Sequence, residues 1–294
     1  MNSKGNKKRR SGQKTPFLAG LKSLVVKNPG PKDGVFWYEI EMLRSSRERP
    51  RIIVTTDVNG TTTPHDTFGE LVSADGLFDE MQELMKSYTS GSCKFSTVLP
   101  KMRHLAAGVD RERLDSYAHK MPLYPGVTTI FNNLAQSKNV EAILALSTTG
   151  FAGLMALVNK FRHRFLLGVA ASPVLINLLS QEERSCLIRP ITDEEEKVEV
   201  LDDLVNLHRP DRRLLFHVGD TMGDFAAIRH TAELGGTGIA FNPNKPLKKS
   251  ISGLSRDLRK RICEIEFGVD AKPDYTGVGD IIKDSVWKVH KTGI

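Results

Sequence analysis

The chain has 294 residues, an ordinary globular composition and a formal net charge of +7, which suits one large domain or a core domain with a smaller insertion. Residues 1–32 hold nine Lys or Arg and no acid, and the other 262 residues carry 33 basic and 35 acidic groups. The charge therefore belongs to one end of the chain, and the body gives no clear sign of nucleic-acid binding. The three cysteines are widely spaced without a CxxC pair, which argues against a disulfide framework or a structural zinc site.

The basic tail, residues 1–32, is poor in apolar side chains, and we expect it to be disordered. It could touch nucleic acid or an anionic membrane, although a solvated terminus is the simpler interpretation. The tail lacks the apolar segment of a signal peptide. The most apolar window, residues 165–179, is shorter than a bilayer span and contains Ser, Pro and Asn. The sequence therefore predicts a cytoplasmic protein without a membrane span.

Residues 51–64 (RIIVTTDVNGTTTP) join an apolar run to a polar turn with one carboxylate. The pair Asn59-Gly60 is a strong hairpin signal when alternating strands flank it, so a β-hairpin is the first interpretation. The run 52–56 does not alternate, however, and no alternating partner follows it. We therefore favour a buried strand that ends at Asp57.

Residues 68–121 have helical periodicity, most clearly at 77–88 and 95–108, which predicts a small helical bundle. Three basic residues of this segment could reach an anionic substrate, or could form a solvated helix face: Lys101, Arg103 and His104.

Two later apolar runs also end in small polar residues, and each precedes a helical pattern: 142–146 before Ser147 and Thr148 with a helix at 151–161, and 214–218 before Gly219 and Asp220 with a helix at 224–232. Strands that alternate with helices indicate a parallel sheet, which is buried on both faces and so needs no alternation within a strand. The sequence predicts an α/β fold.

Ligands bind beyond the carboxyl ends of the strands in an open parallel sheet. The predicted strand ends carry Asp57, the pair Ser147-Thr148, and Asp220, with Asp224 four residues further on. Carboxylates brought together in this way repel one another unless a cation lies between them. Oxygen ligands of this kind suit Mg²⁺, which also accepts a phosphate oxygen.

Four segments together resemble the haloacid dehalogenase (HAD) superfamily: IVTTDVNGT at 53–61, LALST at 144–148, the helix start at Lys197, and VGDTMGD at 218–224. The phosphoserine-phosphatase-like branch is the most similar, with PLYPGV at 122–127 and GTGIAFNPNKP at 236–246 as further matches. The resemblance covers about residues 50–250. It implies a doubly wound, Rossmann-like core (50–67 and 122–294) with a small helical cap at 68–121.

The resemblance also implies a chemistry, namely magnesium-dependent hydrolysis of a small phosphorylated metabolite, a phosphomonoester. Asp57 would be the nucleophile that forms an aspartyl-phosphate. Ser147, Thr148 and Lys197 would bind the phosphoryl group, and Lys197 would stabilise its developing charge. The implied metal ligands are Asp57, the backbone carbonyl of Asn59, Asp220 and Asp224.

One position departs from the family pattern. The residue two after the nucleophile is usually Asp, the general acid and base, whereas here it is Asn59, which cannot exchange a proton at neutral pH. The loss of such a group costs about 10²- to 10⁴-fold in rate. Hydrolysis could therefore be slow, or the chain could be a phosphotransferase or a non-hydrolysing phosphate-binding regulator.

His65 and Asp66 are the nearest groups that could replace the missing acid. The competing interpretation makes His65 an exposed loop residue and Asp66 the N-cap of the next helix, and we favour it. Asp66 is also a candidate substrate contact, as are Lys101 and Arg103.

Phosphoserine itself is not the expected substrate. Family enzymes that act on it usually have a Glu before the cap, an Arg in the cap and a final motif GDGxND. The corresponding places here hold Asp66, a position near Met102, and Gly223.

Two further features favour structural interpretations. His217 lies inside an apolar run and is predicted to be a core histidine, and residues 255–267 are predicted to form a basic amphipathic helix. The sequence gives no indication of the oligomeric state.

Overall fold

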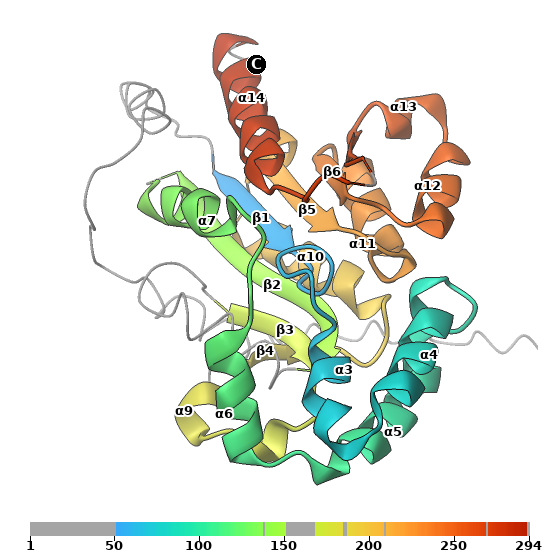
Figure 1. Cartoon of the computed structure of the whole chain (residues 1–294). Helices are drawn as coiled ribbons and strands as arrows, with labels where there is room; N and C mark the ends of the chain where they lie inside the picture. The colour runs from blue at the N-terminus through green and yellow to red at the C-terminus, as the bar shows by residue number, and fades with distance from the viewer. Residues whose placement is uncertain are drawn as a thin grey trace, which may run out of the picture.

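The computed structural model describes residues 51–137, 139–150, 168–184, 187–208, 210–268 and 270–292. Within these ranges, seven parallel strands form one sheet in the order β4-β3-β2-β1-β5-β6-β7, with helices around it (Figure 1). The strands are β1 (Ile52–Thr56), β2 (Val140–Gly150), β3 (Gly168–Ser172), β4 (Leu187–Pro190), β5 (Leu215–Gly219), β6 (Thr237–Phe241) and β7 (Ile262–Ile265). The predicted α/β fold with a parallel sheet is confirmed.

Within the described residues, helices connect the strands and follow the last one. They are α3 (Thr67–Val72), α4 (Phe78–Thr89), α5 (Phe95–Leu105), α6 (Arg111–Lys120), α7 (Val127–Gln136), α9 (Gln181–Arg184), α10 (Glu196–His208), α11 (Met222–Glu233), α12 (Lys245–Ser252), α13 (Arg256–Arg259) and α14 (Thr276–Thr292). None of these described helices is long and apolar enough to cross a membrane.

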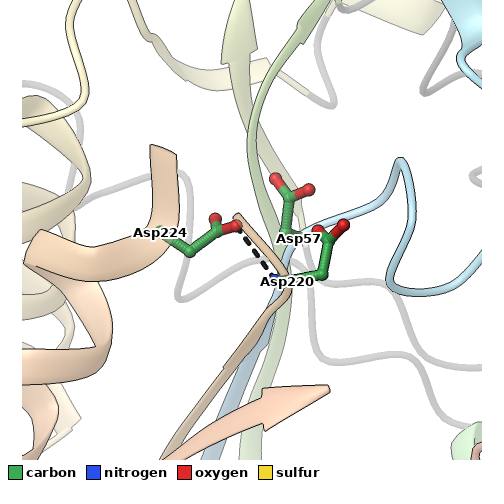
Figure 2. Close-up of side chains that lie close together, drawn as sticks. All are labelled: Asp57, Asp220 and Asp224. Atoms are coloured by element: carbon green, nitrogen blue, oxygen red, sulfur yellow. Dashed lines mark hydrogen bonds between the residues drawn. The ribbon is translucent and has the colours of Figure 1, made fainter. Parts of the chain in front are cut away.

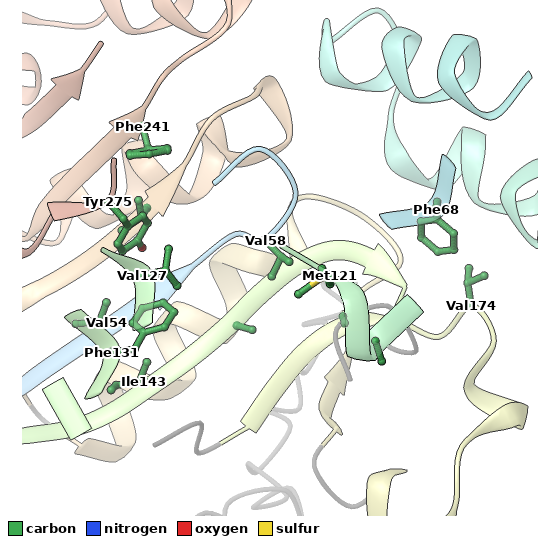
Figure 3. Close-up of a cluster of buried hydrophobic side chains, with 14 of the residues drawn as sticks. Val54, Val58, Phe68, Met121, Val127, Phe131, Ile143, Val174, Phe241 and Tyr275 are labelled. Atoms are coloured by element: carbon green, nitrogen blue, oxygen red, sulfur yellow. The ribbon is translucent and has the colours of Figure 1, made fainter. Parts of the chain in front are cut away.

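The central strand β1 is buried on both faces. Val54 belongs to a cluster that includes Phe131 of α7 and Tyr275 beside α14 (Figure 3), whereas its neighbour Ile53 packs in a second cluster with Leu201 of α10. Successive side chains of a strand point to opposite faces, so two covered faces require an uninterrupted apolar run. This explains the three consecutive apolar residues Ile52, Ile53 and Val54.

The hairpin interpretation of Asn59-Gly60 is wrong. Strand β1 pairs in parallel with β2 on one side and β5 on the other, which leaves no place for an antiparallel partner. Asn59 and Gly60 instead form a tight turn after the strand, in which Gly60 has a φ of 75°. Glycine adopts this left-handed conformation without steric cost.

Four helices, α3 to α6, lie between β1 and α7, in the segment where the sequence predicts a helical insert. Helices α4 and α5 correspond to the periodic stretches 77–88 and 95–108. Helix α3 begins after Asp66, whose side chain accepts a hydrogen bond from the backbone N–H of Phe68. The prediction of Asp66 as a helix N-cap is thus confirmed.

The predicted helix at 255–267 is wrong. This segment forms the short α13 and then β7, which pairs with β6 through Gly238 and Ile262. The apolar side chain of Ile262 is buried at the end of the sheet, and tertiary pairing overrides the local helical pattern. The predicted helix at 224–232 is present as α11. The predicted helix at 151–161 and the predicted disordered tail at 1–32 lie outside the described residues.

Tyr275 connects the last helix to the strand that carries Asp57. It is fully buried, its hydroxyl lies 3.1 Å from Thr56 Oγ1, and its ring is 5.7 Å from Phe131 and 5.4 Å from Phe241 between centroids. Because Thr56 directly precedes Asp57, α14 helps to fix the end of β1.

We expect Tyr275→Ala to lower the free energy of unfolding by about 3–5 kcal/mol, since it leaves a cavity in the core, and Tyr275→Phe to cost about 1 kcal/mol for one hydrogen bond. Urea denaturation measures both changes. Trp287→Ala, at a half-exposed aromatic of the same helix, is the control and should cost much less than Tyr275→Ala. Equal losses for these two alanine variants would show that Tyr275 has no special place in the core.

Candidate active site

Three carboxylates meet at the carboxyl ends of the central strands (Figure 2). Asp57 follows β1, Asp220 follows β5, and Asp224 lies in the first turn of α11. One oxygen atom from each lies within 4.8 Å of the other two. Asp57 and Asp224 are buried, and Asp220 is half-buried. The parallel topology therefore gathers the acidic groups that the sequence places at separate strand ends.

Lys197 lies in the same cluster. Its side chain is 1% exposed, and its Nζ donates to Asp224 Oδ1 at 2.6 Å and to Asp57 Oδ1 at 3.3 Å. Lys197 is the second residue of α10, whose start is fixed by Glu196, which accepts hydrogen bonds from the backbone N–H and hydroxyl of Thr192. Helix α10 thus places a buried ammonium group against two of the three carboxylates.

Asp224 also organises the loop that carries Asp220. Its Oδ2 accepts hydrogen bonds from the backbone N–H groups of Asp220 and Thr221, and it forms a capping box with Thr221 at the start of α11. An anion in the first turn of a helix is also favoured by the helix dipole. One oxygen of Asp224 therefore binds Lys197 and the other binds this loop. We call this structural role of Asp224 a brace, because it holds the cluster together.

Asp220 is held by the turn after β1. Thr61 Oγ1 donates to Asp220 Oδ1 at 2.9 Å, and Gly60 approaches so closely that a Cβ there would lie 2.0 Å from Asp220 Oδ2. Gly60 is therefore required by both its φ angle and this contact. The conformation of the turn sets the spacing between Asp57 and Asp220.

The electrostatics of the cluster are unbalanced, because one ammonium faces three carboxylates. Burial, reinforced by repulsion from Asp224, raises the pKa of Asp57 to about 6 against the opposing effect of Lys197. Burial and repulsion from Asp224 and Asp57 raise the pKa of Asp220 well above its usual value. Burial also acts to raise the pKa of Asp224, but Lys197 and His217 outweigh it and the net shift is downward.

The excess negative charge gives the cluster the chemistry of a cation site. Carboxylate oxygens are the ligands that Mg²⁺ prefers in proteins, and a divalent ion would remove the repulsion that raises the pKa values of Asp57 and Asp220. The donor set therefore fits a divalent metal.

Ser147 and Thr148 lie at the end of β2, next to Asp57. Ser147 is fully buried and hydrogen-bonds the Asp57 carboxylate. Thr148 Oγ1 donates to the hydroxyl of Tyr88, at the end of α4, at 3.1 Å. The structure thus brings both predicted phosphate-binding residues to the acidic cluster and adds an aromatic residue from the helical segment.

Asn59 faces Asp66 rather than the carboxylate cluster. Its Nδ2 donates to Asp66 Oδ1 at 3.4 Å, and its Oδ1 accepts from the backbone N–H of Thr67 at 3.4 Å. Asp66 also accepts from the Phe68 N–H and, at 2.8 Å, from Gln82 Nε2. Both Asp66 oxygens are engaged, although burial raises the pKa of this carboxyl group. These contacts favour the N-cap interpretation over a proton-exchanging role for Asp66.

The other candidates are His65 and the basic residues of α5. His65 Nδ1 is 3.6 Å from Glu70 Oε1. Lys101, Arg103 and His104 are exposed on α5, whereas Met102 between them is fully buried. A role for these basic residues in substrate binding stays a prediction.

The sequence did not single out Thr61, whose hydroxyl binds Asp220, or Tyr88, whose hydroxyl binds Thr148. The buried His217 places Nδ1 at 2.9 Å from Thr55 Oγ1 and Nε2 at 3.8 Å from Asp224 Oδ1. The core position predicted for this histidine is confirmed. Alternation of side chains along residues 214–218 places His217 on the same face of the sheet as Leu215, which packs with α10 and α11. The contact of Tyr88 with Thr148, in contrast, has no signal in the local sequence.

Solved structures share this fold. A phosphoserine phosphatase described as a phospho-aspartyl intermediate analogue matches with a TM-score of 0.61 and 17% identity, over 79% of this chain and 99% of its own. A substrate-bound phosphoserine phosphatase matches with a TM-score of 0.60 and 16% identity, over 80% and 99%. A HAD family hydrolase from Salmonella enterica matches with a TM-score of 0.57 and 16% identity, over 81% and 77%.

No protein-family model matches the sequence, and no curated protein sequence matches it significantly. At identities this low, the structural likeness establishes the fold. The chain has the fold of these phosphoserine phosphatases and of the HAD family hydrolase, with a Rossmann-like core, as the sequence motifs predict.

We expect Lys197→Met to lower the free energy of unfolding by about 3–5 kcal/mol near pH 7, because it leaves buried carboxylates unpaired. Asp57 already has a pKa of about 6, above its unfolded value, and loss of the ammonium raises carboxylate pKa values further. The folded variant then binds protons more tightly than the unfolded chain, so its deficit should shrink toward pH 5. Urea denaturation across this pH range measures the effect.

Lys249→Met, at an exposed lysine of α12, is the matched control for the lost charge. A Lys197→Met deficit that does not change with pH would mean that the ammonium does not compensate the carboxylates.

Proposed function

We propose that this chain is a magnesium-dependent phosphomonoester hydrolase that acts on a small phosphorylated metabolite through an aspartyl-phosphate on Asp57. The observation that carries this proposal is the buried cluster of Asp57, Asp220 and Asp224 around Lys197 Nζ. The shared fold with phosphoserine phosphatases supports it, as does the phospho-aspartyl state named for one of those proteins. In this proposal residues 68–121 are a cap on a core formed by 50–67 and 122–294.

In the proposed reaction, a carboxylate oxygen of Asp57 attacks phosphorus and the bond from phosphorus to the ester oxygen breaks. The departing oxygen takes a proton from solvent and leaves as the alcohol. Ser147 and Thr148 bind the phosphoryl oxygens. Lys197 stabilises the negative charge that spreads over those oxygens in the transition state. Water then attacks the phosphorus of the aspartyl-phosphate and gives up a proton to solvent. The bond between phosphorus and the Asp57 oxygen breaks, which releases inorganic phosphate and regenerates the carboxylate.

The proposed metal ligands are the side chains of Asp57 and Asp220 and the backbone carbonyl of Asn59, with Asp224 as a further ligand or a brace. Bound Mg²⁺ would neutralise the carboxylates and polarise a phosphoryl oxygen. The brace role for Asp224 is supported by the engagement of both its oxygens with Lys197 and the Asp220 loop.

The second candidate function is a phosphotransferase or a phosphate-binding regulator that does not complete hydrolysis. Asn59 favours it, because an amide cannot protonate the leaving group or deprotonate water. The nearby Asp66 has both oxygens in hydrogen bonds that fix the start of α3. Formation of the aspartyl-phosphate and its hydrolysis therefore have to be tested separately.

We expect fluoroberyllate to form a magnesium-dependent adduct on Asp57, detectable by fluorine NMR, because this species mimics a phosphoryl group on a carboxylate. Asp57→Asn should abolish the adduct, and Asp79→Asn, at an exposed residue of α4, should leave it unchanged. An adduct together with phosphate release from a metabolite panel supports the hydrolase. An adduct without release indicates a transferase or a stalled enzyme, and the absence of both contradicts catalysis through Asp57.

We expect Asn59→Asp to raise hydrolysis of p-nitrophenyl phosphate by about tenfold or more, since it restores a group that can exchange protons. The neighbouring Asp66 should raise the pKa of the new carboxyl group and keep it partly protonated near neutral pH. Steady-state kinetics measure the change, with Asn133→Asp on α7 as the control. An unchanged or lower rate, in a variant that still forms the fluoroberyllate adduct, would show that Asn59 does not limit turnover.

A further inference from the structure

Tyr88 reaches from the helical segment into the strand-end cluster. It is the next-to-last residue of α4, its side chain is 3% exposed, and its hydroxyl accepts a hydrogen bond from Thr148 Oγ1 at 3.1 Å. Its ring packs against Phe95 of α5 at 5.2 Å between centroids. One end of this side chain is therefore fixed by a helix pair and the other by the end of β2.

The hydroxyl of Tyr88 also fills the space beside Gly223. A Cβ atom at position 223 would lie 2.2 Å from the Tyr88 hydroxyl and 2.7 Å from its Cζ. Gly223 directly precedes Asp224 in α11, so only a residue without a side chain allows the ring to lie here. Tyr88 thus spans the gap between the end of β2 and the start of α11, on two sides of the carboxylate cluster.

Two hydrogen bonds hold the helices around Tyr88 against the core loops. Asn244 Nδ2 donates to the carbonyl oxygen of Thr89 at 2.8 Å, and the backbone N–H of Phe95 donates to Glu194 Oε2 at 3.0 Å. Asn244 also donates its own N–H to the Asp220 carbonyl oxygen at 3.0 Å. Anchors on both sides restrict the movement of the ring.

The geometry of the proposed phosphoryl transfer indicates where the leaving group of the substrate lies relative to the Tyr88 ring. The attacking and leaving oxygens of a phosphoryl transfer are roughly in line, so the leaving group lies opposite Asp57, beyond the strand ends. Tyr88 of α4 meets Thr148 and Gly223 at these strand ends. Burial raises the pKa of Tyr88, so the phenol keeps its proton and stays uncharged at neutral pH.

We infer that Tyr88 is a specificity-determining residue, whose ring closes the phosphate site on the side of the helical segment and restricts it to phosphomonoesters with a small leaving group. This inference rests on the proposed phosphatase function. In this inference, the ring of Tyr88 selects the size of the leaving group, and Thr148 and Gly223 determine where the ring lies.

The test measures binding of two non-hydrolysable phosphonates, methylphosphonate and benzylphosphonate, by calorimetry in the presence of Mg²⁺, and so does not require turnover. We expect the wild-type chain to prefer methylphosphonate by about tenfold or more, which is a typical effect of pocket shape. Tyr88→Leu removes the ring and should reduce that preference by about tenfold through tighter benzylphosphonate binding. Tyr88→Phe keeps the ring and should leave the preference within about threefold of the wild type.

A Tyr88→Leu variant with the wild-type preference would overturn the inference. A wild-type chain that binds benzylphosphonate as tightly as methylphosphonate would overturn it as well, whether or not the variants fold. If the chain binds neither phosphonate and forms no fluoroberyllate adduct, both the proposed function and this inference are wrong. If the chain forms the adduct on Asp57 but shows no preference between the two phosphonates, only the role of Tyr88 is wrong.

Discussion

The arrangement of the site depends on one buried ammonium. Lys197 Nζ lies between Asp224 and Asp57 with almost no exposure to solvent, and a charge in that position is tolerated only with partners. The pKa of Lys197 is raised, because the attraction of Asp224 and Asp57 outweighs the opposing effect of burial. This pairing requires α10 and α11 to pack on the same face of the sheet as the second apolar cluster. The fold and the charge pattern are therefore coupled, since a shift of either helix would leave buried carboxylates unpaired.

Much of the fold could be predicted from the sequence, because a parallel sheet imposes a simple pattern. Strands covered on both faces need consecutive apolar residues, and residues 52–54 and 215–216 provide them. The convergence of Asp57 and Asp220 follows from topology, since β1 and β5 are parallel neighbours whose carboxyl ends share one edge. Strand β7 could not be predicted in this way, because its residues fit an amphipathic helix locally and become a strand only through pairing with β6.

The part of the site that escaped prediction depends on contacts between distant segments. Tyr88 is one of several apolar residues in a helical stretch, and nothing near it in the sequence distinguishes it from the rest. Its importance arises from Thr148, which binds its hydroxyl, and from Gly223, which leaves room for its ring. Gly223 alone predicts only a close approach by some other group. The identity of that group required the packing of α4 against α11.

The amide of Asn59 both donates and accepts a hydrogen bond, which an ionised carboxylate cannot do. It accepts a hydrogen bond from the N–H of Thr67 and donates one to Asp66, so it ties the turn after Asp57 to the start of α3. An ionised carboxylate at position 59 could accept but not donate, and it would face the Asp66 carboxylate across the same gap. The residue that replaces the expected proton-exchanging group thus also strengthens the junction between the loop after Asp57 and the helical segment. In the proposed reaction, phosphoryl binding by Asp57, Ser147 and Lys197 does not need that proton, whereas release of the alcohol and attack by water do. Asn59 would therefore leave phosphate binding intact and slow both chemical steps, and the fate of the aspartyl-phosphate decides between a hydrolase and a phosphate-holding protein.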